Sequence, residues 1–119
     1  MEFNKLTLFF MLLLCSVMAC SQEQPRLKVA IFVHEGVQLL DFSGPGEVFD
    51  DAGFEVYTVA PDAKEITSQG FLKINPNYSM EDCPQPDIMV FPGGATNNPM
   101  SDERVIQWIQ KTAPGAQHV

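Results

Sequence analysis

The chain has 119 residues, of which 45% are hydrophobic and 18% are charged, a balance typical of one globular domain. Fifteen acidic and seven basic residues give a net charge of -8, which repels nucleic acid and anionic lipid headgroups, so neither is an expected partner. The three cysteines, Cys15, Cys20 and Cys83, are too few and too widely spaced for a disulfide framework or a zinc site, so no metal is predicted.

The chain begins with an apolar run that has the plan of a secretory signal. Residues 6–19 contain only Thr7 and Ser16 as polar side chains, behind a short start that carries Lys5. A membrane-spanning helix needs about 20 apolar residues, and this run is shorter. We therefore predict a signal peptide of lipoprotein type over residues 1–19.

The end of this run, Val17-Met18-Ala19-Cys20, resembles a bacterial lipobox. Cys20 would become the lipidated N-terminus, and residues 20–25 would form a polar tether to the fold. The predicted location is the periplasmic face of a bacterial membrane, with the lipid as the one membrane contact. A plain cleavable signal, giving a soluble periplasmic or secreted protein, is the alternative.

Two strands and a helix are predicted next. Lys28 to His34 is nearly all apolar and rich in β-branched residues, which is typical of a strand buried on both faces of a parallel sheet, and we expect it to be central. Glu47 to Ala52 is expected to form a short helix closed by Gly53. Phe54 to Ala60 alternates in polarity and predicts a second strand.

The following part of the chain predicts a hairpin, a loop and a third strand. Ile66 to Ile74 is interrupted by a Ser-Gln-Gly turn, which indicates a small hairpin. Asn75 to Pro86 holds three prolines and is predicted to be a loop. Asp87 to Phe91 is a third buried strand, ended by a Pro-Gly-Gly turn.

The last predicted elements are a helix and the start of a fourth strand. Ser101 is the expected N-cap, Pro114-Gly115 the expected end, and His118-Val119 the start of the strand. Strands that alternate with helices predict an α/β fold with a flavodoxin-like, doubly wound parallel sheet, truncated at the end of this chain. The helix is expected to bury one face, made of Val105, Ile106, Trp108 and Ile109.

Three segments resemble one family in the same order. They are KVAIFVHEGVQLLDFSGPGEVF from Lys28, FEVYTVAPDAKEITSQGFLKINPNYS from Phe54, and PDIMVFPGGATNNPMSDERVIQWIQKTAP from Pro86. Together they are similar to the ThiJ/PfpI family of the class I glutamine amidotransferase-like fold. The resemblance is greatest to the branch that contains isonitrile hydratase and the sensor domains of some transcription regulators.

The resemblance implies that residues 26–119 are the N-terminal half of such a domain. Members of the family carry a nucleophilic cysteine on a strained turn after the fourth strand, and that position is expected about five residues beyond Val119. No residue of this chain matches it.

Asp41 matches the acidic position that hydrogen-bonds the cysteine sulfur in the isonitrile hydratase-like branch. The resemblance implies that it exchanges a proton with that sulfur during attack and hydration. The alternative is that Asp41 caps the following helix.

Gly93 and Gly94 follow the third strand at its carboxyl end, where doubly wound folds bind ligands. Glycine lets backbone amides face an oxyanion, so this turn is the candidate oxyanion or pocket half of the site. The alternative is an ordinary glycine-rich turn. Residues 95–97 continue this loop and are candidates for lining the pocket.

Other residues are given smaller roles. Gly44 and Gly46 are expected to let the first helix pack closely, and their spacing is not a dinucleotide-binding fingerprint, so no cofactor is expected. Cys83 is interpreted as a bystander. The two histidines, His34 and His118, are interpreted as structural.

The sequence leaves three functional hypotheses. The first is a lineage of cysteine-dependent hydratases, amidases or hydrolases that act on a small molecule with a polarised C=N, C≡N or C=O group. The second is a module of the same fold that binds or senses a small ligand without turnover. The third is an inactive remnant, which is favoured for the chain as it stands, and an open sheet edge makes a homo-oligomer a further expectation.

Overall fold

The computed structural model describes residues 25–94 and 99–119. Its main sheet has the strand order β5-β2-β1-β6, and all its pairs are parallel. The central strand β1 (Lys28–Phe32) lies between β2 (Glu55–Ala60) and β6 (Ile88–Val90). The prediction of an α/β fold with a central, fully flanked first strand is confirmed.

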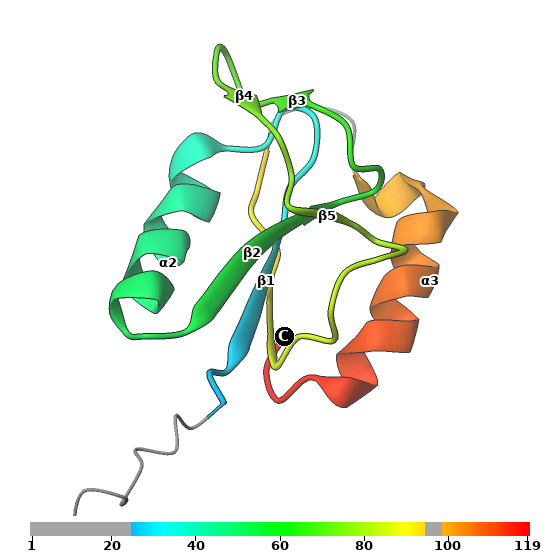
Figure 1. Ribbon diagram of the computed structural model, residues 1–119. Coiled ribbons are helices and arrows are strands. Elements are labelled where there is room, and N and C mark those ends of the chain that lie inside the picture. The colour runs from blue at the N-terminus through cyan, green and yellow to red at the C-terminus, as the bar shows by residue number, and fades with distance from the viewer. Residues whose placement is uncertain (1–24, 95–98) are drawn as a thin grey trace, which may run out of the picture.

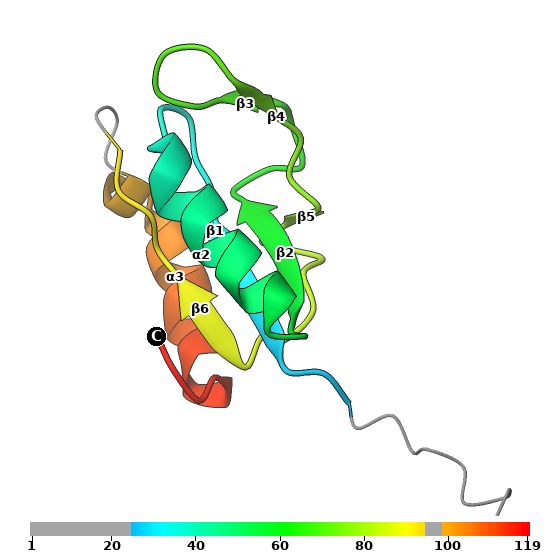
Figure 2. The same cartoon turned by 90° about the vertical axis from the view of Figure 1, so that its left-hand side faces the viewer.

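Two helices cover opposite faces of this sheet (Figures 1 and 2). Helix α2 (Leu39–Asp51) connects β1 to β2, and α3 (Glu103–Thr112) follows β6. Because successive strand residues point to opposite faces, β1 supplies side chains to both layers. The sheet is therefore doubly wound, as the alternation of elements predicts.

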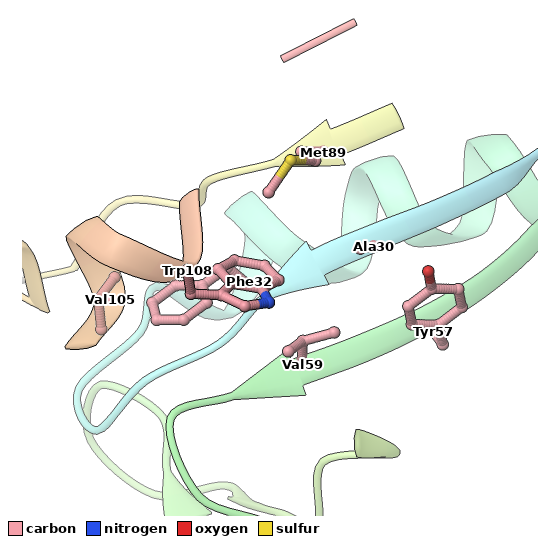
Figure 3. Close-up of a cluster of buried hydrophobic side chains, with 7 residues drawn as sticks. All are labelled: Ala30, Phe32, Tyr57, Val59, Met89, Val105 and Trp108. Atoms are coloured by element: carbon pink, nitrogen blue, oxygen red, sulfur yellow. The ribbon is translucent and has the colours of Figure 1, made fainter. Parts of the chain in front are cut away.

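The two faces hold separate hydrophobic cores. Val29, Ile31 and Val33 are buried on the α2 face, together with Val37 and Ala60. On the α3 face, Phe32 lies at the centre, and its ring stacks on Trp108 with the centroids 5.8 Å apart. Figure 3 shows this second core, which consists of Ala30, Phe32, Tyr57, Val59, Met89, Val105 and Trp108.

Helix α2 begins eight residues earlier than the sequence predicts, at Leu39 instead of Glu47. The sequence analysis began the helix at Glu47, after Pro45 and the two glycines that flank it. Pro45 is inside the helix, where its missing N–H leaves the Asp41 carbonyl without an intrahelical donor. No residue of α2 is fully buried, and an unpaired carbonyl costs less free energy at such a surface than in a buried helix, so the helix tolerates the proline.

The C-terminal end of α2 is as predicted. The helix ends at Asp51, and Gly53 follows with a φ of 85°, the left-handed conformation that favours glycine after a helix. Of the other glycines in this region, Gly46 lies against β1, since a Cβ there would be 3.5 Å from the Ile31 side chain. A Cβ built on Gly44 would have no heavy atom within 4 Å apart from its chain neighbours and its own helix backbone. The expectation of close packing is therefore wrong for Gly44.

The predicted hairpin is confirmed, but the predicted loop after it contains a short strand. Strands β3 (Ile66–Thr67) and β4 (Lys73–Ile74) pair antiparallel. Strand β5 (Tyr78–Ser79) then pairs with the outer edge of β2. Hydrogen bonds between Asn77 and Thr58 hold this segment in place: Asn77 Oδ1 accepts from the Thr58 N–H at 2.8 Å, and the Asn77 N–H donates to Thr58 Oγ1 at 3.0 Å.

Helix α3 is capped by Asp102 and not by Ser101. Ser101 ends a short 3₁₀ helix, Pro99–Ser101, and the Asp102 carboxylate accepts from the Arg104 N–H at 3.0 Å. The buried face of α3 consists of Val105, Trp108 and Thr112, while Ile106 is 38% exposed. These three buried residues are spaced by three and four positions and so lie in one row along the helix. Ile106 follows Val105 by one residue, which turns its side chain about 100° away from that row.

After α3 the chain returns to the free edge of β6. A second 3₁₀ helix spans Ala113–Gly115, and His118 then forms a parallel bridge with Ile88. The Met89 N–H donates to the His118 carbonyl at 3.0 Å. The prediction that a fourth strand begins at His118 is supported by this one parallel bridge, but residues 118–119 form no strand of their own.

Candidate functional site

The strand order reverses next to β1. Helix α2 carries the chain from β1 to β2 on one side, and the later connection from β5 leads to β6 on the other side of β1. Ligands of doubly wound folds bind where the strand order reverses, outside the carboxyl ends of the strands. The ends of β1 and β6 therefore define the candidate site, and the segments there are residues 33–41 and 91–94.

The structure brings together Asp41 and Gly93, which the sequence analysis singled out separately. Asp41 is the third residue of α2, and one of its carboxylate oxygens, Oδ2, accepts from the Gly93 N–H at 3.2 Å. Asp41 is exposed, so its carboxylate is accessible. The N-cap position belongs to Gln38, whose side chain makes no capping hydrogen bond, so the alternative interpretation of Asp41 as the N-cap is wrong.

A second set of backbone contacts fixes the turn after β6. The Gln38 N–H donates to the Gly93 carbonyl at 2.8 Å, and Val37 and Gly94 form an antiparallel bridge. A Cβ on Gly94 would lie 2.6 Å from the Gly36 carbonyl oxygen, closer than such atoms pack. Only glycine fits at position 94 without a backbone shift, so the turn is held against the segment that precedes α2.

His34 lies beneath this turn. It is 6% exposed, and its Nδ1–H donates to the Glu35 carbonyl at 2.9 Å. Its Cε1 atom would be 2.8 Å from a Cβ on Gly94. The interpretation of His34 as structural agrees with this packing. The imidazole packs against Gly94 and so helps to hold the turn in place.

Gly36 and Gln38 also hold the candidate site together, and neither was predicted from the sequence. Gly36 has a φ of 77°, and its N–H donates to the Thr67 carbonyl at 2.8 Å. This contact ties the end of β1 to the hairpin. A glycine directly after a buried strand was the available signal, because such a position favours a left-handed turn. Gln38 gave no signal, since its backbone alone makes the contact.

The arrangement provides an accessible carboxylate and a glycine turn held by backbone contacts at one edge of the sheet. A carboxylate can hydrogen-bond a nucleophile and exchange a proton with it. The Gly93 N–H points to Asp41 here, so this donor is occupied by the carboxylate. Within residues 25–94 and 99–119, no group of three His, Cys, Asp or Glu side chains is arranged to hold a metal ion.

Cys83 lies away from this site. It is in the connection that leads into the amino end of β6, whereas Asp41 and Gly93 are at the carboxyl ends of the strands. Its side chain packs against the α3-face core, and this burial raises the pKa of the Cys83 thiol. A raised pKa lowers the thiolate fraction, so the environment is that of an unreactive cysteine.

Several predicted residues fall outside the described part of the chain. They are the signal peptide, the lipidation residue Cys20, and residues 95–97 of the loop after Gly94.

Within residues 25–94 and 99–119, none of the helices combines the length and the apolar character needed to cross a bilayer.

The fold and the candidate site define a doubly wound α/β domain with an acidic residue and a Pro-Gly-Gly turn at the strand-order reversal. Residues 27–119 match the model of the DJ-1/PfpI family. The chain belongs to this family, which confirms the resemblance to ThiJ/PfpI proteins.

Similar proteins support the same assignment. The chain is 34% identical to isonitrile hydratase of Pseudomonas putida over 95 residues, which cover 78% of this chain and 42% of that enzyme. A solved ThiJ/PfpI family protein from Pseudomonas syringae superposes with a TM-score of 0.71 at 23% identity, over 83% of this chain and 44% of that one. A DJ-1 superfamily protein from Salmonella typhimurium, solved as a cysteine-to-alanine mutant, gives 0.67 at 17% identity over 74% and 50%. The chain thus spans less than half the length of the curated relative.

Proposed function

We propose that Asp41 and the Gly93-Gly94 turn are one half of the active site of a cysteine-dependent hydratase or related hydrolase. The substrate class is a small molecule with a polarised C≡N, C=N or C=O group. The observation that carries this proposal is the contact between the Asp41 carboxylate and the Gly93 N–H, which joins residues 52 apart in sequence at the carboxyl edge of the sheet.

Two further observations support the proposal. The family match covers residues 27–119 and so includes Asp41 and the turn, and the chain is 34% identical to isonitrile hydratase over 95 residues. Asp41 and the two glycines are also exposed, which leaves the edge open to a partner segment and a substrate.

Asp41 would act on the sulfur of a cysteine that lies outside these 119 residues. Its carboxylate would hold the thiol, accept its proton as the sulfur attacks the electrophilic carbon, and pass that proton to the substrate as the C–S bond forms. Water would then add to the same carbon, the C–S bond would break, and a proton from that water would restore the thiol as the hydrated product leaves. Gly93 and Gly94 would supply backbone N–H groups for the negative charge that develops, once Gly93 is released from Asp41.

A chimera provides the test of the proposed function. The chain to Val119 is joined to the second half of the Pseudomonas putida isonitrile hydratase, and formamide formation from a small alkyl isonitrile is measured. We expect turnover, and Asp41→Asn should reduce kcat by about 10²- to 10⁴-fold because general acid–base catalysis is worth that much. Glu47→Asn, at an exposed acidic position on the same helix, is the matched control.

Two results would contradict the proposal. A folded chimera in which Asp41→Asn keeps full turnover would remove Asp41 from the mechanism. A folded chimera that binds the isonitrile without converting it would favour the alternative, a ligand-binding or sensor module of this fold.

We further propose that the 119 residues alone do not catalyse these reactions. Cys83 is the one cysteine within the described residues, and it lies at the other end of the strands from Asp41 with a raised pKa. Assays for thiol-dependent hydratase, amidase or glyoxalase activity should give no turnover. Activity that disappears in Cys83→Ala would contradict this.

For localisation we propose export as a lipoprotein with a diacylated Cys20. The support is the sequence Val17-Met18-Ala19-Cys20 behind an apolar run. Mass spectrometry of the N-terminal peptide tests it. An unmodified mature N-terminus would favour plain secretion, and an intact Met1 in the cytosol would exclude export.

A further inference from the structure

A groove lies between α3 and the connection from β5 to β6, on the α3 face of the sheet. It consists of two adjoining hollows of about 300 and 220 Å³. Small-molecule sites begin at about 300 Å³, so the groove has the size for a compact metabolite. Four residues border both hollows: Met80, Glu81, Trp108 and Lys111.

Opposite charges line this groove without meeting. Glu81 and Lys111 both border it, and neither forms an ion pair within 4.0 Å with any residue of 25–94 or 99–119. The other cation of the groove, Arg104, is already paired with Asp62 and Asp102, at 3.5 and 2.7 Å. One free negative and one free positive group therefore remain, set apart from each other.

The floor between these charges is apolar and held by the core. Trp108 is 8% exposed, and its indole stacks on Phe32 with the ring centroids 5.8 Å apart. Met80 is half-buried and packs against the same core. Because Met80 and Trp108 are already held by the core, they lose little conformational entropy when a ligand binds, which reduces the free-energy cost of binding.

We propose that the groove binds a small zwitterion with an apolar side chain, of the α-amino acid class. The ligand carboxylate pairs with Lys111, its ammonium group pairs with Glu81, and its side chain lies on Met80 and Trp108. A simple carboxylate would face Glu81 unpaired, and a simple amine would face Lys111 unpaired. Only a ligand with both charges can form ion pairs with both Glu81 and Lys111.

Trp108 is the single tryptophan of the protein, so intrinsic fluorescence reports on the floor of the groove. L-leucine is titrated into the soluble fraction of the chain, whose folded state is first verified by circular dichroism. The same titration is done with 4-methylpentanoate, which lacks the ammonium group, and with leucinamide, which lacks the carboxylate. We expect saturable binding of leucine with a Kd of about 0.1–1 mM, as fits a small polar ligand at an open site. Each analogue should bind about fivefold more weakly, as the loss of one exposed ion pair implies. Calorimetry repeats each titration independently of the fluorophore.

Charge-removing variants identify the site. Glu81→Gln and Lys111→Gln should each weaken leucine binding about fivefold. Glu47→Gln and Lys64→Gln remove the same charges outside the groove and should leave binding unchanged, as should Asp41→Asn. No saturable leucine binding in either measurement would overturn the proposal, and so would equal affinities for the three ligands or equal effects of groove and control variants. These results do not depend on the activity proposed for Asp41.

Discussion

At the scale of single residues, the candidate site depends on glycines whose surroundings differ sharply. Gly94 is crowded by backbone, since a Cβ there would lie 2.6 Å from the Gly36 carbonyl oxygen and 3.1 Å from Val37 Cα. Gly44, on the exposed side of α2, has nothing within 4 Å. The two residues look alike in the sequence, and only their neighbours distinguish them.

The substitution Gly94→Ala should lower the free energy of unfolding by about 1–3 kcal/mol, because backbone atoms must move to admit the methyl group. The change Gly44→Ala should alter it by less than about 0.5 kcal/mol, because the better helix propensity of alanine is offset by the restriction that Pro45 places on the residue before it. Urea unfolding of both variants measures the difference. Equal effects in the two variants would show that the turn is not packed as described.

At the scale of elements, the start of α3 depends on one carboxylate. Asp102 accepts from the backbone N–H of Arg104 and also pairs with its guanidinium group. The hydrogen bond from the Arg104 side chain is the largest cause that lowers the pKa of Asp102 below its ordinary value of 3.8. The same cap fixes the helix whose inner face supplies Val105 and Trp108 to the core.

Replacement of Asp102 by alanine should lower the melting temperature by a few degrees at pH 7, because α3 loses its N-cap. Asparagine can still accept from the backbone, so Asp102→Asn should retain most of the stability at pH 7. The lowered pKa means that the ionised form stabilises the folded state above pH 3.8, and this contribution is lost as the pH falls below that value. The difference in melting temperature between wild type and Asp102→Asn should therefore shrink in acid. A constant difference between pH 7 and pH 3 would contradict this assignment.

At the scale of the whole molecule, strand β6 lies at one edge of the main sheet, and only part of that edge is paired. His118 covers it at Ile88 and Met89. Within the described residues, Val90 and Phe91 have no strand partner on that side. Unpaired N–H and C=O groups beside apolar side chains are a template for pairing with another chain.

We predict that residues 20–119 expressed alone form oligomers or aggregate, because this edge can pair between copies. Sedimentation velocity and thermal melting test the prediction, with the isonitrile hydratase chimera as the control that extends the chain past Val119. A soluble monomer with one cooperative transition would show that the edge is not a site of association.

The sequence by itself predicted strands β1, β2 and β6, the central place of β1 and the family, but it did not predict β5. Lys28 to His34 and Asp87 to Phe91 are mostly apolar, and such short runs are typical of strands that are buried on both faces. The right-handed rule for parallel connections then restricts the strand order. Asp41, Gly93 and Gly94 were also found from the sequence, through the family resemblance and through the position of the glycines after a strand.

Only the tertiary structure decided the start of α2, the cap of α3 and the contact between Asp41 and Gly93. Local propensity treats proline and glycine as breaks, but Pro45 lies in a helix with no fully buried residue, where a missing helical hydrogen bond costs less free energy than in a buried helix. Ser101 and Asp102 are both good caps, and the packing of Val105 and Trp108 selects the helix start that favours Asp102. A hydrogen bond across 52 residues has no local signature, because it depends on how the carboxyl ends of two strands meet.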